Sequence, residues 1–325
     1  MGSVETQLYD QVIHKVMVPE DVRQSGKPTP EIVAEGAAFL HRDGIVILEN
    51  AIDTAHLDTL NAILSKEALE IAEDPNHHFN FGKETRNMDQ APPPREDLMF
   101  KDVWCNPFAA AILAGILGPR PVVHYANGNT ALKATGRQPV HSDCEFEHPN
   151  FPFAMVVNIN LVDTSPKNGA TEFWLGSHHC STPDDHHVVD GKLEASLQIK
   201  KEHVEARRKH SPPIQTTTKK GSLIIRDLRL WHAGMPNKTD EPRVMLAFVL
   251  EPAWYQGRGL VKLPRSVKAL VESWSDELQF AADWVDEVDH KKIRSTDTNF
   301  DTGSVALEKY RKGLAHRPEY FQPTY

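Results

Sequence analysis

The character of the sequence changes at Pro121, and this change constrains the fold more than any other feature. Before it, apolar residues recur at helical spacing. After it, short apolar runs are separated by turn-forming residues and not by helices. The runs are residues 122–125 (VVHY), 153–162 (FAMVVNINLV), 222–226 (SLIIR) and 244–250 (VMLAFVL). A doubly wound sheet needs helices between its strands, so we predict a mainly β fold, a β-sandwich or jelly roll with flanking helices.

The N-terminal part carries helix signals. Thr29 and Pro30 form a typical helix start, and Gly44 is placed to end that helix. These signals and the apolar spacing predict helices over residues 29–44, 53–72 and 107–117, with a short buried strand over 45–48.

Length and composition fit one globular domain. The chain has 325 residues, of which 40% are hydrophobic and 25% charged, so it can bury a large core. Neither a repeat nor a low-complexity tract divides it. We therefore treat residues 1–325 as a single domain with helices over about 29–118, a jelly-roll core over about 121–255 and a C-terminal extension over 256–325, which includes a short helix at 266–275.

The overall charge excludes some partners. With 36 Lys plus Arg against 45 Asp plus Glu, the net charge of −9 argues against nucleic acid and anionic membranes as partners. No stretch has the length of a membrane span, no signal peptide is recognisable, and the three cysteines form no CxxC. We expect a cytoplasmic protein that acts on a small molecule. The sequence leaves open whether it forms a homodimer.

The string Gln138-Pro139-Val140-His141-Ser142-Asp143 carries the first candidate metal ligands. Residues two apart on an extended segment point to the same side, so His141 and Asp143 can reach one ion together. An imidazole and a carboxylate suit a divalent first-row metal. In a chain with 17 histidines this motif needs support from elsewhere.

That support comes from Trp231-His232-Ala233-Gly234 and from Arg243, eleven residues after His232. His232 would complete a face of two histidines and one carboxylate, which is typical of oxygen-activating Fe(II) and leaves positions open for a cosubstrate and O₂. A turn at 236–238 would return Arg243 to the side of His232. Its guanidinium suits the far carboxylate of a dicarboxylate cosubstrate.

Together these residues resemble the phytanoyl-CoA dioxygenase family of Fe(II)/2-oxoglutarate-dependent oxygenases. The match rests on His141, Asp143, His232, Arg243 and the segment 168–178, which reads NGAT…GSH, and it is strongest to fungal members that tailor natural products. The resemblance implies a double-stranded β-helix, a cupin-like form of the jelly roll. It also implies Fe(II) on the three ligands, 2-oxoglutarate and O₂ as cosubstrates, and a role for Gln138 and Thr171 beside Arg243 in holding 2-oxoglutarate.

The resemblance implies oxidation of a small organic substrate, by hydroxylation, desaturation or ring modification, in secondary metabolism. Because Asp143 fills its ligand position, a halide has no vacated place, and we do not expect halogenation. No basic patch for a CoA phosphate stands out, so we do not extend the acyl-CoA substrate of the family to this chain. A zinc-type metallohydrolase and a non-catalytic jelly-roll binding protein are the alternatives, and the first leaves Arg243 and Gln138 without a role.

Residues 73–97 are too long for a simple connector. Their mixture of aromatic and charged side chains suggests a lid, and Arg86 and Met88 are the predicted substrate contacts. The alternative is that residues 73–97 form a surface loop packed by its own side chains. In that case the 181–219 insertion is the next candidate for contacting the substrate. Cys144 is expected to pack, and the histidine pairs at 77–78, 178–179 and 186–187 to lie in solvent.

Overall fold

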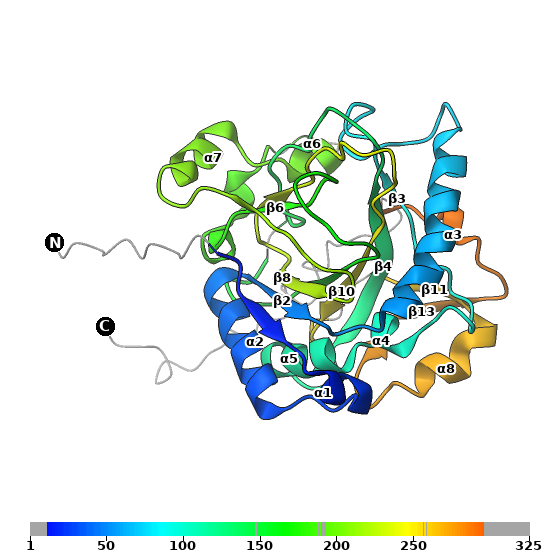
Figure 1. Ribbon diagram of the computed structural model, residues 1–325. Helices are drawn as coiled ribbons and strands as arrows, with labels where there is room; N and C mark the ends of the chain where they lie inside the picture. Colours follow the sequence, from blue (N-terminus) through cyan, green and yellow to red (C-terminus); the bar gives the residue numbers. More distant parts are fainter. Residues whose placement is uncertain are drawn as a thin grey trace, which may run out of the picture.

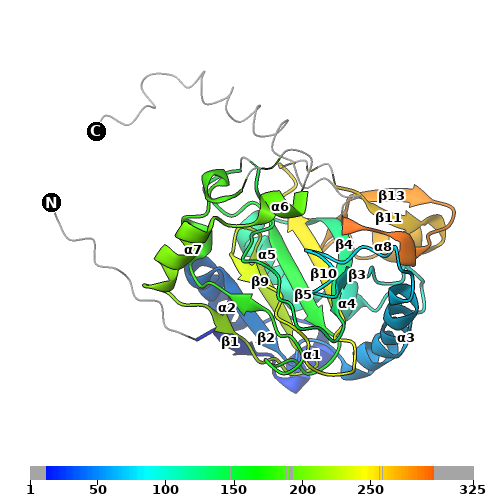
Figure 2. The same cartoon turned by 90° about the horizontal axis from the view of Figure 1, so that it is seen from above.

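A mixed sheet of eight strands forms the centre of the fold in the computed structural model, which describes residues 12–146, 148–187, 189, 193–255, 257 and 259–295 (Figure 1). Along the sheet the order is β1 (Lys15–Met17), β2 (Ile45–Glu49), β8 (Leu223–Asp227), β5 (Met155–Asn160), β10 (Met245–Glu251), β4 (Val122–Ala131) and β12 (Gln279–Phe280), with β3 (Asn87–Asp89) also on β4. The inner strands pair antiparallel, and Figure 2 shows β5, β10 and β4 side by side. All four strand runs expected after Pro121 are present.

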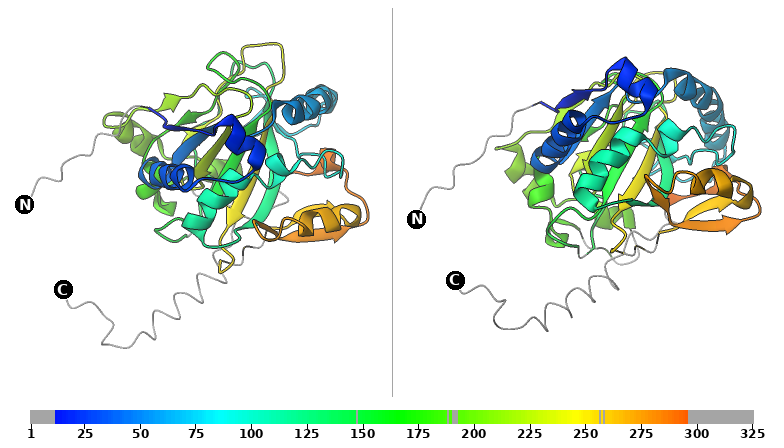
Figure 3. Two further views of the ribbon diagram at one scale, coloured as in Figure 1. Left: turned by 60° about the horizontal axis from the view of Figure 1, so that its bottom comes forward. Right: turned by 90° about the horizontal axis from the view of Figure 1, so that it is seen from below.

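Helices cover one face of this sheet (Figure 3). They are α1 (Glu20–Ser25), α2 (Pro30–Asp43), α3 (Thr54–Ala72), α4 (Lys101–Trp104) and α5 (Pro107–Leu117). The predicted start and end of α2 are confirmed, because Thr29 accepts a hydrogen bond from the Ile32 amide and Gly44 has a φ of 79°. Helices α2 and α5 pack closely, since a Cβ at Gly36 would lie 2.5 Å from Ile112.

The main hydrophobic core fills the space between these helices and the sheet. Leu40 and Ile112 from the helices meet Val157 and Phe248 from β5 and β10, and all four are at most 5% exposed. Fully burying one such side chain is worth about 1.5–3 kcal/mol. This packed face leaves the other face of the sheet for the cavity.

A second, smaller sheet lies on the other face. It consists of β7 (Ile214–Gln215), β6 (Glu172–Phe173) and β9 (His232–Ala233). Phe173 of this sheet packs with Ile45, Ile47 and Ile224 of β2 and β8. The fold is therefore of the jelly-roll class, with these two sheets packed together and flanked by helices, although the described strands do not close a barrel.

Segments outside the predicted 121–255 core contribute to it. Strands β1, β2, β3 and β12 all join the main sheet. The turn η1 (Ser177–His179) precedes the insertion, which forms η2 (Pro183–Asp185), α6 (Leu193–Leu197) and α7 (Lys201–Arg208). The C-terminal extension forms β11 (Val261–Pro264), η3 (Arg265–Val267), α8 (Lys268–Glu272), β13 (Ala282–Val285) and η4 (His290–Lys292). The helix predicted at 266–275 corresponds to η3 and α8. The rest of the predicted extension, 296–325, lies outside the described residues.

Within the described part of the chain, none of the helices combines the length and apolar character that crossing a membrane requires.

Candidate active site

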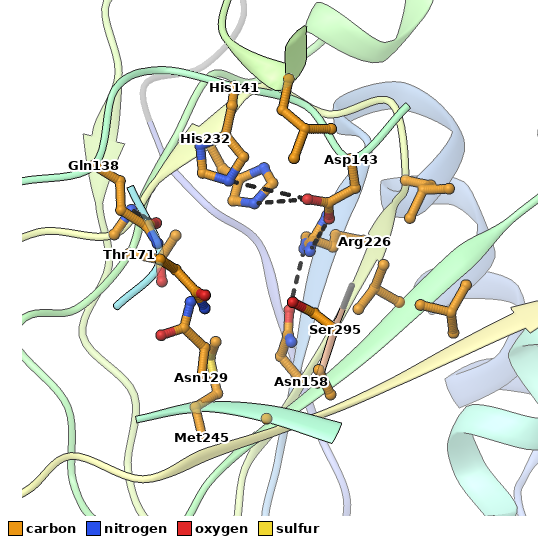
Figure 4. Close-up of a pocket in the computed structure, with 18 of the residues that line it drawn as sticks. Asn129, Gln138, His141, Asp143, Asn158, Thr171, Arg226, His232, Met245 and Ser295 are labelled. Carbon is orange, nitrogen blue, oxygen red and sulfur yellow. Dashed lines mark hydrogen bonds and ion pairs between the residues drawn. The ribbon is translucent and has the colours of Figure 1, made fainter. Parts of the chain in front are cut away.

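Three candidate metal ligands meet at one point (Figure 4). His141 pairs with His232 across an isolated antiparallel bridge, with backbone N–H···O distances of 3.0 and 2.9 Å. Asp143 Oδ1 lies 3.9 Å from Nε2 of His141 and 3.7 Å from Nε2 of His232. The three ligand atoms all lie within 4.8 Å of one another, close enough to share one ion.

Both histidines are oriented by their own backbone. Nδ1 of His141 lies 2.9 Å from the Pro139 carbonyl oxygen, and Nδ1 of His232 lies 2.9 Å from that of Leu230. A carbonyl oxygen only accepts, so Nδ1 carries the hydrogen on each ring. Each Nε2 therefore presents its lone pair toward the shared point, as metal binding requires.

The charge states also suit a divalent cation. Burial by itself would raise the pKa of Asp143, but the guanidinium of Arg226 and the nearby rings of His232 and His141 together outweigh burial and hold this pKa well below its usual range. Burial lowers the pKa of His232 well below its usual value, and Arg226 adds to that effect. At neutral pH the site thus has an ionised carboxylate beside a neutral imidazole.

Arg243 lies in the same cavity and has no carboxylate partner among the described residues. It is 2% exposed, and its Nη1 and Nη2 donate to the carbonyl oxygens of Asn129 and Gly169 at 3.2 and 3.1 Å. Its Nε has no hydrogen-bond partner in the described part of the chain. Burial lowers the pKa of Arg243 to about 10, so it stays protonated at neutral pH. A buried cation of this kind calls for an anion, and the carboxylate of a dicarboxylate fits.

Gln138 and Thr171 line the cavity together with Arg243. The Gln138 side-chain oxygen accepts from the Gly234 amide at 2.8 Å, which leaves its NH₂ group for another partner. Asn129 also lines the cavity, and its buried side-chain oxygen has no partner. The structure thus brings all six residues predicted for metal and cosubstrate into one cavity.

Comparison with known proteins identifies the family. The sequence model of the phytanoyl-CoA dioxygenase (PhyH) family matches residues 40–245, which is more than half of the chain. This chain belongs to the phytanoyl-CoA dioxygenase family. It is therefore a 2-oxoglutarate-dependent non-haem iron enzyme, and the donor set of the cavity fits that metal and that cosubstrate.

Solved structures support the fold of this family member. One is the epimerase SnoN in complex with Fe³⁺, alpha-ketoglutarate and nogalamycin RO, at 21% identity and a TM-score of 0.52, covering 69% of this chain and 85% of that one. Another is the carbocyclase SnoK from nogalamycin biosynthesis, at 16% identity and a TM-score of 0.50, covering 70% and 85%. At these identities the likeness is one of fold.

The rest of the cavity in this PhyH-family chain is mainly apolar. Its lining includes Phe81, Tyr125, Phe146, Val156, Leu197, Leu228 and Val249. A few polar side chains interrupt the apolar wall: Asn80, Asp89, Glu145, Asn158 and Ser295. Such a wall suits an apolar ligand with a few polar groups.

The structure does not bring the predicted substrate contacts Arg86 and Met88 into the cavity. Met88 is fully buried and packs against Ala68 and Leu132, because side chains alternate along β3 and Met88 faces away from Asp89. Arg86 is exposed, has a φ of 46° and borders a separate surface hollow. The 73–97 segment still reaches the cavity, through Asn80, Phe81 and Asp89.

The insertion borders the site as well. Leu197 lines the cavity, and His186 Nε2 lies 2.8 Å from the Ser142 hydroxyl, between the two ligands of the HxD string. The expectation that the histidine pairs lie in solvent is wrong for His77, His178 and His186, which are at most 6% exposed. They form no second metal group within the described residues, and Cys144 packs as expected.

Sequence reasoning missed Arg226 and Asn158. Both line the cavity, and Arg226 donates from Nη2 to Asp143 Oδ2 at 2.6 Å. The available signal was an arginine at the end of the otherwise apolar run 222–226, since a buried strand holds a charge only when that charge has a partner.

Proposed function

We propose that this enzyme oxidises a small, mainly apolar organic molecule, and that His141, Asp143 and His232 hold its Fe(II). The observation that carries the proposal is the presence, in one cavity, of these three ligand atoms and the buried guanidinium of Arg243, which has no carboxylate partner among the described residues. The alternative of a zinc hydrolase leaves Arg243 without a role. The alternative of a non-catalytic binding protein leaves the three ligand atoms without a role.

In this proposal Arg243 holds the distal carboxylate of 2-oxoglutarate, assisted by Gln138 and Thr171. When bound, the iron and 2-oxoglutarate supply the oxidising chemistry with O₂. The chain keeps Nε2 of each histidine unprotonated through the carbonyl contacts at Nδ1. The apolar wall orients the substrate and excludes water from the reacting centre.

The reaction within this class is proposed to be hydroxylation, desaturation or ring modification, in secondary metabolism and in the cytoplasm. The fold alone does not select among these, since the similar structures include an epimerase and a carbocyclase. Asp143 in the ligand position disfavours halogenation. In this proposal the apolar wall around Phe81 and Leu197 positions the substrate and so selects which of these reactions occurs.

The test is an anaerobic titration of the purified protein with Fe(II) and 2-oxoglutarate. We expect a weak visible charge-transfer band in the parent and none in His141→Ala. His203→Ala removes a histidine of the insertion that does not line the cavity, and it should retain the band. A parent protein without the band would contradict the proposal and favour the hydrolase or the binding protein.

A further inference from the structure

Arg226 is the one arginine that touches a candidate metal ligand among the described residues. It lies near the end of β8 and is 6% exposed. Its Nε donates to the Asn158 side-chain oxygen at 3.1 Å, and its Nη2 donates to Asp143 Oδ2 at 2.6 Å. Two strands of the main sheet thus hold the guanidinium, and the guanidinium holds the carboxylate.

The two oxygens of Asp143 have different surroundings. Oδ1 faces Nε2 of His141 and Nε2 of His232, at 3.9 and 3.7 Å. Oδ2 is turned away to Arg226. We propose that Arg226 is a positioning residue that occupies Oδ2, so that Asp143 offers a metal ion only Oδ1.

This inference rests on the proposed function and adds a reason for the open positions of the metal. With one atom from each of three residues, an ion held there would keep positions open for a chelating cosubstrate and O₂. If both oxygens of Asp143 were free, the carboxylate could bind through both, as carboxylates do at other metal sites. One position would then be lost.

An arginine suits this task better than a lysine. Its planar fork binds Asn158 through one nitrogen and Asp143 through another, and so fixes the direction of the contact. A lysine keeps the charge and one contact but has no second arm. The effect of geometry can therefore be separated from the effect of charge.

The experiment compares the parent with Arg226→Gln, Arg226→Lys and the matched control Arg229→Lys. Arg229 forms a buried ion pair with Asp227 just after the same strand and does not line the cavity. Each protein is titrated with Co(II), and the Co(II) form is then titrated anaerobically with 2-oxoglutarate. The absorption spectrum of Co(II) reports coordination, the second titration reports cosubstrate affinity, and thermal unfolding reports integrity.

We expect Arg226→Gln to change the Co(II) spectrum and to weaken 2-oxoglutarate binding at least about tenfold, the usual effect of losing an outer partner of a metal ligand. Arg226→Lys should recover part of the affinity. Arg229→Lys should lower the melting temperature while leaving the spectrum and the affinity at parent values.

Parent-like spectrum and affinity in Arg226→Gln would overturn the inference, and so would equal losses in Arg226→Gln and Arg229→Lys. If Arg226→Gln does not fold, Asn158→Ala replaces it. This variant removes only the second contact of Arg226, so a smaller shift in the same direction is expected, and parent values would again overturn the inference. A parent that binds neither Co(II) nor 2-oxoglutarate contradicts the proposed function instead.

Discussion

Two parts of the cavity lining, a polar side and an apolar side, are built differently. The part of the lining with Arg243, Gln138 and Thr171 is polar and comes from residues 138–243. Another part is mainly apolar and comes from segments far apart in the sequence, with Phe81 after α3 and Leu197 of the insertion, and Ser295 near the end of the described chain adds a hydroxyl. The polar side therefore suits a constant cosubstrate, and the apolar side suits a substrate particular to this enzyme.

The largest effect should come from the proposed metal ligands. His232→Ala leaves the ion held by two residues, so succinate formation should fall by more than about 100-fold, beyond the effect of losing an outer partner. Quantifying succinate with saturating Fe(II) measures this loss. Near-normal turnover would remove His232 from the ligand set. Asp143→Gly should be the milder variant, since an exogenous anion can take the vacated position.

The polar side is tested by Arg243→Lys. The charge is retained but the fork is lost, so the affinity for 2-oxoglutarate should fall about 10- to 100-fold, the range for lost hydrogen bonds to a charged group. Substrate affinity should hardly change. Measuring both apparent constants decides the point, and an unchanged constant for 2-oxoglutarate would move the anchor to another residue.

The apolar side is tested by Phe81→Ala and Leu197→Ala. Both should raise the ratio of succinate to oxidised product several-fold while leaving 2-oxoglutarate affinity intact, because a looser wall positions the substrate poorly. Arg86→Ala is the matched control in the same loop, and it should keep the parental ratio because Arg86 lies outside the cavity. A shifted ratio in Arg86→Ala alone would indicate that Arg86 contacts the substrate.

Met88→Ala separates stability from chemistry. Met88 is fully buried beneath the loop, so the substitution should lower the free energy of unfolding by about 2–5 kcal/mol. The coupling ratio of the folded protein should stay at the parent value. Urea unfolding together with product analysis tests both statements. A changed ratio of succinate to oxidised product at unchanged stability would indicate that Met88 contacts the substrate.

The last prediction concerns Glu251, at the end of β10, where the change in stability per pH unit is small. Burial raises the pKa of Glu251 to about 8, and burial lowers the pKa of the adjacent His124, so both are neutral near pH 7. Because the pKa of Glu251 is higher in the folded state than in the unfolded state, the folded state binds the proton more tightly. The contribution of Glu251 to the free energy of unfolding is therefore present at pH 4 and is lost as the pH rises toward 8.

Glu251→Gln should therefore flatten the decline of unfolding free energy between about pH 5 and 8, a slope of at most about 1.4 kcal/mol per pH unit. Urea unfolding at several pH values measures it. The same slope in parent and variant would assign the pH dependence to other groups.

The amino-acid sequence by itself determined the local features of this protein. The helix over 29–44 followed from a cap, a proline and a glycine, and the ligand string followed from residues two apart on an extended segment. The placement of Arg243 in the same cavity as the candidate ligands followed from a return of the chain after His232. These placements could be predicted because the covalent chain and short-range hydrogen bonds fix geometry over a few residues.

Only the tertiary structure decided the rest. Arg226 contacts Asp143 across 83 residues of sequence, and Met88 faces the core because β3 pairs with β4 in one particular register. A shift by one residue would have exchanged Met88 with its neighbours. Strand register and the meeting of Phe81, Leu197 and Ser295 depend on how whole elements pack, and long-range packing leaves no local pattern in the sequence.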